Sequence, residues 1–150
     1  MQTAREFMEA CLREQAAYIQ WHRQYHRVFG QKYYSEECLK YPWIGYRFTA
    51  FAELLSTVET LGDTALAFTV NAGTRKKWKR YHLRVSHGKW EIYDEDGHCT
   101  ACDGTGRNQM PMRFRNGRWE SNHQPETCFV CGGSGWHNQC VVPKTPGKTA

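Results

Sequence analysis

The stretch that decides the fold is residues 80–96, "RYHLRVSHGKWEIYDED". Two alternating runs flank the turn "HGK", and this pattern is typical of a β-hairpin. In the first run Tyr81, Leu83 and Val85 share one face of the expected strand, and the basic residues between them share the other. We therefore expect a hairpin with one apolar face and one polar face.

A second hairpin is expected directly upstream. The segments "YRFTAFAELLSTVET" and "TALAFTVNA" flank the turn "LGD" and are rich in β-branched and aromatic residues. The two hairpins together predict a four-stranded antiparallel meander.

The N-terminal residues predict a helix. Thr3 and Glu6 have the spacing of a capping box, and apolar residues then recur at helical spacing as far as Phe29. Gly30 is typical of a helix C-terminus. We expect one long amphipathic helix over about 3–29, followed by a loop over 31–46 with a short helix near "SEECLKY".

This order of elements resembles the nuclear-transport-factor-2-like (NTF2-like) superfamily, in which a curved sheet wraps around a long N-terminal helix to form a cone. The resemblance covers residues 1–97. The closing hairpin carries "GKWEI", similar to the G-x-W-x-I ending common in that superfamily. It implies an α+β fold. The superfamily holds enzymes, transport adaptors and immunity proteins against toxins, so the fold alone selects no function.

The last third of the chain carries the pattern C-x-x-C-x-G-x-G twice, at 99–106 and 128–135. Two thiolate pairs complete a tetrahedron around Zn²⁺, so Cys99, Cys102, Cys128 and Cys131 predict one structural zinc ion per chain. The alternative is a pair of redox-active dithiols. Four residues nearby could replace a ligand, although the spacing does not demand it. They are His98, His123, His137 and Cys140.

The four glycines of the repeats allow the backbone to take positive φ and to pass close to the metal. They are Gly104, Gly106, Gly133 and Gly135. Between the repeats, "MRFRNGRWES" predicts a hairpin that turns at Asn116-Gly117. Residues 98–140 therefore form a zinc-binding arm that is too small for a self-sufficient core. Residues 141–150 are expected to be a mobile tail.

The double repeat resembles the cysteine-rich zinc domain of DnaJ-type chaperones over residues 99–137. Those chaperones usually carry four repeats and two zinc ions, whereas this chain has two repeats. The His-Pro-Asp triplet of the J-domain is absent from the sequence, so stimulation of a partner ATPase is not implied. The resemblance implies metal ligation by the four cysteines and, by analogy, binding of exposed protein segments or thiol chemistry.

The composition is that of a globular protein, with 150 residues, 40% hydrophobic residues and a formal charge of +5. The sequence has no apolar run of membrane-spanning length and no signal-peptide pattern. We therefore expect a cytoplasmic protein without a membrane partner. In that reducing compartment, the seven cysteines predict metal ligands or buried thiols rather than disulfides.

Two further groups of residues are candidate sites. A basic strip with one aromatic residue could contact nucleic acid, although a solvated edge strand is the preferred interpretation. This strip is Arg75, Lys76, Lys77, Trp78, Lys79 and Arg80. A pocket in the cone could hold acid–base groups. Its candidate residues are His22, His26, Tyr46, Glu53 and His82.

We expect a non-catalytic zinc-binding protein that acts as a protein-interaction module of adaptor, chaperone-like or toxin-immunity type. Its partner would be another protein or a second copy of the chain. The alternative is a lyase, isomerase or hydrolase that binds a small molecule in the cone. Nucleic-acid binding through the basic strip is the third hypothesis.

Overall fold

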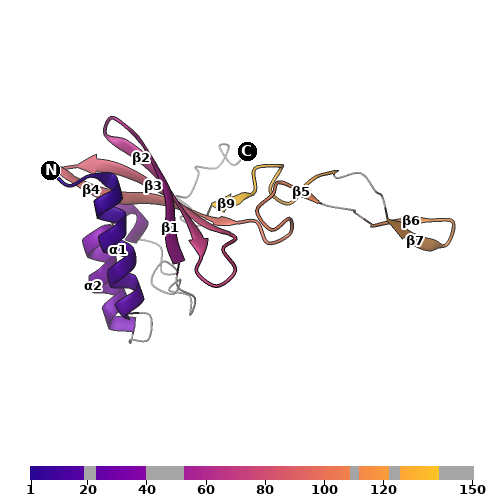
Figure 1. Cartoon of the computed structure of the whole chain (residues 1–150), viewed down its shortest axis with the longest axis horizontal. Helices are drawn as coiled ribbons and strands as arrows, with labels where there is room; N and C mark the ends of the chain where they lie inside the picture. Colours follow the sequence, from indigo (N-terminus) through magenta and orange to yellow (C-terminus); the bar gives the residue numbers. More distant parts are fainter. Residues whose placement is uncertain (19–22, 40–52, 109–111, 122–125, 139–150) are drawn as a thin grey trace. The chain divides into compact units, whose positions relative to one another are not determined.

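The computed structural model describes residues 1–18, 23–39, 53–108, 112–121 and 126–138 (Figure 1). The helices are α1 (Ala4–Tyr18), α2 (Arg23–Tyr33) and α3 (Glu36–Leu39). The strands are β1 (Glu53–Leu61), β2 (Thr64–Asn71), β3 (Lys77–Ser86), β4 (Lys89–His98), β5 (Arg107–Asn108), β6 (Met112–Arg115), β7 (Arg118–Ser121), β8 (Glu126–Thr127) and β9 (Trp136–Asn138). The predicted tail over 141–150 lies outside the described residues.

The chain divides into two compact units. The first unit contains Met1–Asp96 together with Asn138–Ala150, and the second is Gly97–His137. Each unit is described by itself below.

The main sheet has the strand order β1-β2-β3-β4-β9. β1 pairs antiparallel with β2, with Leu61 opposite Thr64, and β2 pairs antiparallel with β3, with Thr64 opposite Arg84. Both predicted hairpins are therefore confirmed, as is the α+β class. The sequence did not predict β9 as a strand of this sheet.

The prediction of one long helix over 3–29 is wrong, because α1 and α2 lie side by side (Figure 1). The rings of Phe7 and Tyr33 are 5.5 Å apart. In one continuous helix the same residues would be roughly 39 Å apart, at about 1.5 Å per residue. Both helices contribute side chains to one core, so apolar residues recur at helical spacing through both. The sequence pattern therefore does not show where α1 ends and α2 begins.

The predicted helix start is confirmed, whereas the role predicted for Gly30 is wrong. The Glu6 amide donates to Thr3 Oγ1 at 3.1 Å, and the Thr3 amide donates to Glu6 Oε1 at 3.4 Å, which is a capping box. Gly30 lies inside α2 rather than at its end. A Cβ atom there would lie 2.8 Å from Leu39 Cδ2, so this glycine permits α2 and α3 to pack closely.

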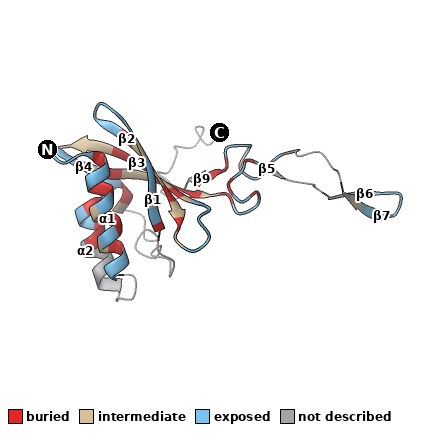
Figure 2. Ribbon diagram, in the orientation of Figure 1, coloured by how far each residue is buried: buried red, intermediate tan, exposed pale blue. Residues whose placement is uncertain are grey.

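The core of the first unit combines side chains from the three helices with one face of the sheet (Figure 2). Tyr81 and Leu83 are buried as the alternation predicts, and Val85 packs against the same cluster. Cys11 and Cys38 are buried in this core. They are therefore ordinary interior thiols.

The second unit contains two small two-stranded sheets, β5 with β8 and β6 with β7. In β6–β7, Arg115 is opposite Arg118, and Asn116 and Gly117 form the turn with φ angles of 53° and 80°. The predicted Asn-Gly hairpin is confirmed. The β5–β8 pair escaped prediction because two-residue strands carry no periodic pattern.

Candidate metal centre

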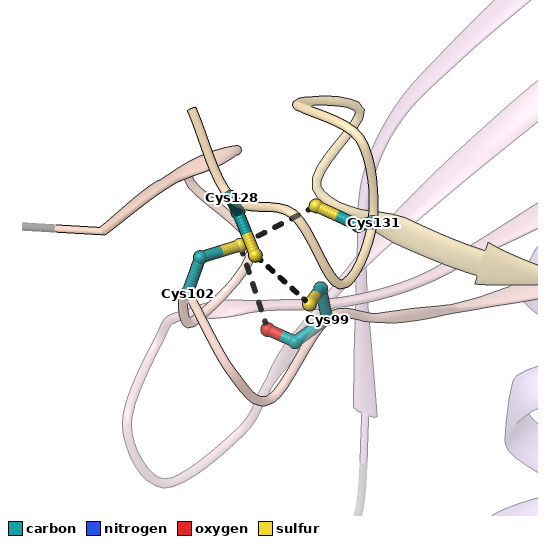
Figure 3. A group of neighbouring side chains, drawn as sticks. All are labelled: Cys99, Cys102, Cys128 and Cys131. Atoms are coloured by element: carbon teal, nitrogen blue, oxygen red, sulfur yellow. Dashed lines mark hydrogen bonds between the residues drawn. The ribbon is translucent and has the colours of Figure 1, made fainter. Parts of the chain in front are cut away.

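The four cysteines of the two repeats meet in the second unit (Figure 3). All four Sγ atoms lie within 4.8 Å of one another. Cys99 Sγ is 3.9 Å from Cys128 Sγ, and Cys102 Sγ is 3.7 Å from Cys131 Sγ. A tetrahedral site with zinc–sulfur bonds of about 2.3 Å separates its sulfurs by roughly 3.8 Å, whereas a disulfide needs about 2.05 Å. The geometry is compatible with a bound metal such as zinc.

Within each repeat, the second glycine donates its amide to the second cysteine. The Gly106 amide lies 3.2 Å from Cys102 Sγ, and the Gly135 amide lies 3.2 Å from Cys131 Sγ. Such N–H···S bonds stabilise negative charge on sulfur. The loop formed by each repeat, at 99–106 and 128–135, is called a knuckle below. Each knuckle therefore stabilises the charged form of one of its own cysteines, which is the form that binds metal.

Across the repeats, the same glycines bind the opposite knuckle. The Cys128 amide donates to the Gly106 carbonyl at 2.9 Å, and the Cys99 amide donates to the Gly135 carbonyl at 2.8 Å. The two knuckles thus hold each other reciprocally. This explains why a chain with one metal centre carries the whole pattern twice.

The second glycine of each repeat also packs against the first glycine of the other. A Cβ atom on Gly106 would lie 2.2 Å from the Gly133 carbonyl oxygen, and one on Gly135 would lie 2.4 Å from that of Gly104. Gly106 and Gly135 have φ angles of 79° and 82°. A side chain at either position is therefore excluded both by backbone conformation and by space.

The surroundings shift the pKa values of three of the thiols in different directions. Burial favours the protonated form of Cys131, but the amides of Gly135 and Gly133 outweigh it and lower its pKa to about 6. Burial likewise opposes ionisation of Cys102, yet the Gly106 amide prevails and its pKa is lowered. At Cys99 burial dominates and raises the pKa to about 11. A metal must therefore displace protons, so its affinity falls in acid.

Within the part of the chain that the structure describes, the ligand set of this centre consists of cysteines alone. Cys99, Cys102 and Cys128 are buried and Cys131 is half-buried. Among the described residues, neither His98 nor His137 joins the group of ligand atoms. His123 and Cys140 lie outside the described residues. Four thiolates fill a tetrahedron and leave no open coordination position for a substrate.

The predicted pocket residues do not form one site in the described structure. Glu53 accepts a hydrogen bond from Tyr81 Oη at 2.6 Å, whereas His82 Nε2 lies 2.6 Å from Asp96 Oδ2. Tyr81 and His82 are neighbours on β3, so these contacts lie on opposite faces of the sheet. Two of the remaining candidates, His22 and Tyr46, lie outside the described residues. For His26 only the backbone within α2 is described.

Sequence reasoning missed a buried charged cluster in the first unit. The ammonium of Lys79 is 3.9 Å from a carboxylate oxygen of Glu53 and 3.4 Å from one of Glu95. Tyr34 Oη donates to the same Glu95 oxygen at 3.2 Å. Lys79 lies two residues before the inward-facing Tyr81 on β3, so the alternation of the strand places both on the same face. This alternation was the feature of the sequence that could have identified Lys79 as buried.

The preferred interpretation of the basic strip as a solvated edge strand is wrong, because β3 lies between β2 and β4 in the sheet. Lys79 is only 7% exposed and belongs to the buried cluster, and Arg80 Nε bonds to Asp96 Oδ2 at 2.8 Å. The exposed basic residues of the strip are Arg75, Lys76 and Lys77. The alternation of β3 divides the strip between the two faces of the sheet.

A second group of ligand-type atoms belongs to His82, Asp94 and Asp96, which lie within 4.8 Å of one another. The guanidinium of Arg80 bonds to Asp96 and supplies positive charge at this place. This group is therefore a weaker candidate for a cation than the four cysteines.

Comparisons with known proteins assign no relative, since no family model, curated protein or solved structure matches the chain. Within the described residues, no helix combines the length and the apolar character needed to cross a membrane. The geometry of the four-cysteine centre is thus the strongest guide to function.

Proposed function

We propose that the protein is a non-catalytic interaction module whose second unit is folded around one structural zinc ion per chain. The observation that carries this proposal is that the unit with the closed four-cysteine centre exposes large apolar side chains, one of them between two of the cysteines. Phe129, within the second knuckle, is 87% exposed, and Trp119 of β7 is 65% exposed. Such side chains at a surface are typical of sites that contact other molecules.

The metal is proposed to be structural because the second unit has little else to hold it together. The buried cluster of this unit consists of Cys99, Cys102 and Cys128, with Cys131 packed against them. Small units without an apolar core usually obtain their folding free energy from metal or disulfides. The closed ligand set also argues against catalysis at the metal.

The exposed side chains lie on elements that the metal or the hairpin turn makes rigid. Phe114 and Trp119 are opposite each other on β6–β7, with ring centroids 5.5 Å apart. Phe129 and Val130 lie between two metal-ligand cysteines. A preordered surface loses less conformational entropy when it binds a partner.

The wider assignments are part of this proposal. The order of helices and antiparallel strands in Met1–Asp96 supports an NTF2-like cone, and the reciprocal glycine contacts support a DnaJ-like zinc unit. We propose a cytoplasmic location and a protein partner, either a different protein or a second copy of the chain. An adaptor, chaperone-like or toxin-immunity role would use the same surface.

The proposal is tested by comparing proteins that co-purify with three tagged chains: wild type, Trp119→Ala and Leu61→Ala. Leu61, at the end of β1, is 83% exposed and controls for loss of any exposed apolar side chain. We expect a partner that is retained by wild type and Leu61→Ala but lost from Trp119→Ala at unchanged zinc content. Self-association is read from sedimentation of the same three chains. Identical partners and identical sedimentation for all three would refute the proposed surface.

The same experiment cannot use Trp136, because that side chain is only 9% exposed. Its truncation is expected to lower stability rather than to remove a contact surface. The exposed Trp119 is therefore the informative tryptophan of this unit.

We propose an enzyme acting on a small molecule as the second candidate, and the observation that favours it is the buried cluster of Glu53, Lys79 and Glu95. Two carboxylates and one ammonium leave one negative charge in excess, which is unfavourable in an interior. If the cluster is retained for chemistry, Glu95→Gln should raise the melting temperature, because functional groups are often placed at the expense of stability. A lower melting temperature of Glu95→Gln would show that the Glu95 carboxylate stabilises the fold. The charged cluster would then no longer support the enzyme.

A further inference from the structure

The first unit contains a pocket of about 560 Å³ that neither proposed function uses. It lies where the segment before α1, the two long helices and the β3–β4 turn come together. Its lining residues are Met1, Gln2, Phe7, Ala10, Lys32, Tyr33, Gly88, Lys89 and Trp90. The volume is within the range of small-molecule sites, about 300–1,000 Å³.

The walls of this pocket are aromatic, and their polar atoms are already bonded within the protein. Trp90 Nε1 donates to the Gln2 carbonyl at 2.9 Å, and Tyr33 Oη donates to Glu14. The Phe7 and Tyr33 rings meet edge to face, 5.5 Å apart. The three aromatic side chains therefore offer apolar ring surfaces rather than free hydrogen-bonding groups.

The charge that lines the pocket is positive. Lys32 is held 2.8 Å from Glu14 Oε2 and lies 5.4 Å from the centre of the Tyr33 ring. Lys89 is exposed, and within the part of the chain that the structure describes it forms no ion pair. Among the described residues, no carboxylate side chain lines the pocket. Lys89 is thus the lining lysine that is available to a ligand beside three aromatic rings.

We propose that this pocket binds a small aromatic monoanion, with its ring between Phe7, Tyr33 and Trp90 and its charge at Lys89. Aromatic walls favour a flat ring through dispersion and edge-to-face contacts. Lys32 is already paired with Glu14, so Lys89 at the edge of the cavity favours a single negative charge, because opposite charges attract more strongly where water is partly excluded. This inference does not depend on the zinc unit.

The test is titration of the full zinc-loaded chain with 2-naphthoate by isothermal calorimetry. We expect one saturable site per chain. The neutral analogue 2-naphthylmethanol should bind at least ~10-fold more weakly, and acetate should not bind, because the ring and the charge are both required.

Three variants locate the site. Lys89→Glu should weaken 2-naphthoate binding at least ~10-fold, whereas Lys77→Glu, on an exposed residue outside the pocket, should leave it within about twofold. Ala10→Phe should fill the pocket and abolish binding. If Ala10→Phe does not fold, the two lysine variants still decide the question. Absence of saturable binding, equal affinity for the neutral analogue, or equal losses in both lysine variants would overturn the proposal.

Discussion

The reciprocal packing of the two knuckles predicts that Gly106→Ala weakens metal binding far more than an otherwise similar glycine substitution. Gly106 has a φ of 79°, and its added Cβ atom would lie 2.2 Å from the Gly133 carbonyl oxygen. Gly132, in the second knuckle, is the matched control. It has a φ of 67°, and nothing lies within 4 Å of an added Cβ atom.

The expected difference follows from the contacts that must move. Both substitutions place alanine in the left-handed region, which costs about 1–2 kcal/mol. At Gly106 the backbone must also shift away from Gly133. That shift lengthens two hydrogen bonds. One runs from the Gly106 amide to Cys102 Sγ, and the other runs from the Cys128 amide to the Gly106 carbonyl. Two weakened hydrogen bonds at about 1 kcal/mol each add roughly 2 kcal/mol. This corresponds to about a 30-fold further loss of metal affinity.

The assay is competition for zinc between each purified chain and a chromophoric chelator, at fixed pH and ionic strength. Gly106→Ala should release its metal at about 30-fold lower chelator concentration than Gly132→Ala. The helical circular dichroism signal, which comes from the helices of the first unit, should be the same in both variants. Equal affinities would refute the argument, since they would show that the knuckles do not need the close Gly106–Gly133 approach.

Three further predictions concern the cysteines and the charges. Removal of the metal by a chelator should make Cys99, Cys102, Cys128 and Cys131 reactive to alkylation, while Cys11, which is 1% exposed, stays protected in peptide mass spectra. Lys79→Met should lower the free energy of unfolding by about 3 kcal/mol, because it leaves two buried carboxylates without their cation, whereas Lys77→Met should change it little in urea titrations. At Glu14, burial opposes ionisation, but hydrogen bonds from Lys32 and Tyr33 outweigh it and lower the pKa below its ordinary 4.5. The stabilisation by this carboxylate is therefore present above about pH 4.5 and lost in acid, so Glu14→Gln should reduce the fall in melting temperature between pH 6 and pH 3.

The sheet and the metal centre could be predicted because their signals are local. Alternation along β3 placed Tyr81 and Leu83 in the core, and the two-residue turn at Asn116-Gly117 fixed the β6–β7 hairpin. The two C-x-x-C pairs likewise predict four metal-binding thiols, because each pair holds its two thiols together on one tight turn. Each of these signals spans only a few residues, and the meeting of the two cysteine pairs was inferred from the four ligands that zinc requires.

The helical hairpin and the charged cluster could not be predicted because they depend on distant contacts. The stripe that ends at Phe29 is equally compatible with one helix or two, and contacts between distant residues, such as that of Phe7 with Tyr33, separate these arrangements. Lys79 was counted with a surface strip because basic residues surround it in the sequence. Its burial follows from Glu53 and Glu95, which come from two other strands.

The departures from ordinary folding rules help to separate the two candidate functions. In β6–β7, Arg115 stands opposite Arg118, although like charges at such positions are destabilising, and the next pair exposes Phe114 beside Trp119. The two rings contact each other edge to face, and their exposed surfaces would gain further contacts from a molecule that binds them. The cluster around Lys79 differs, because its carboxylates are bonded by Tyr34 and Tyr81 within the same unit. Natural proteins keep such local conflicts mainly where function requires them. Glu120 lies 3.8 Å from Arg118 and partly offsets the charge conflict, but Phe114 and Trp119 remain exposed, and this favours the interaction module over the enzyme.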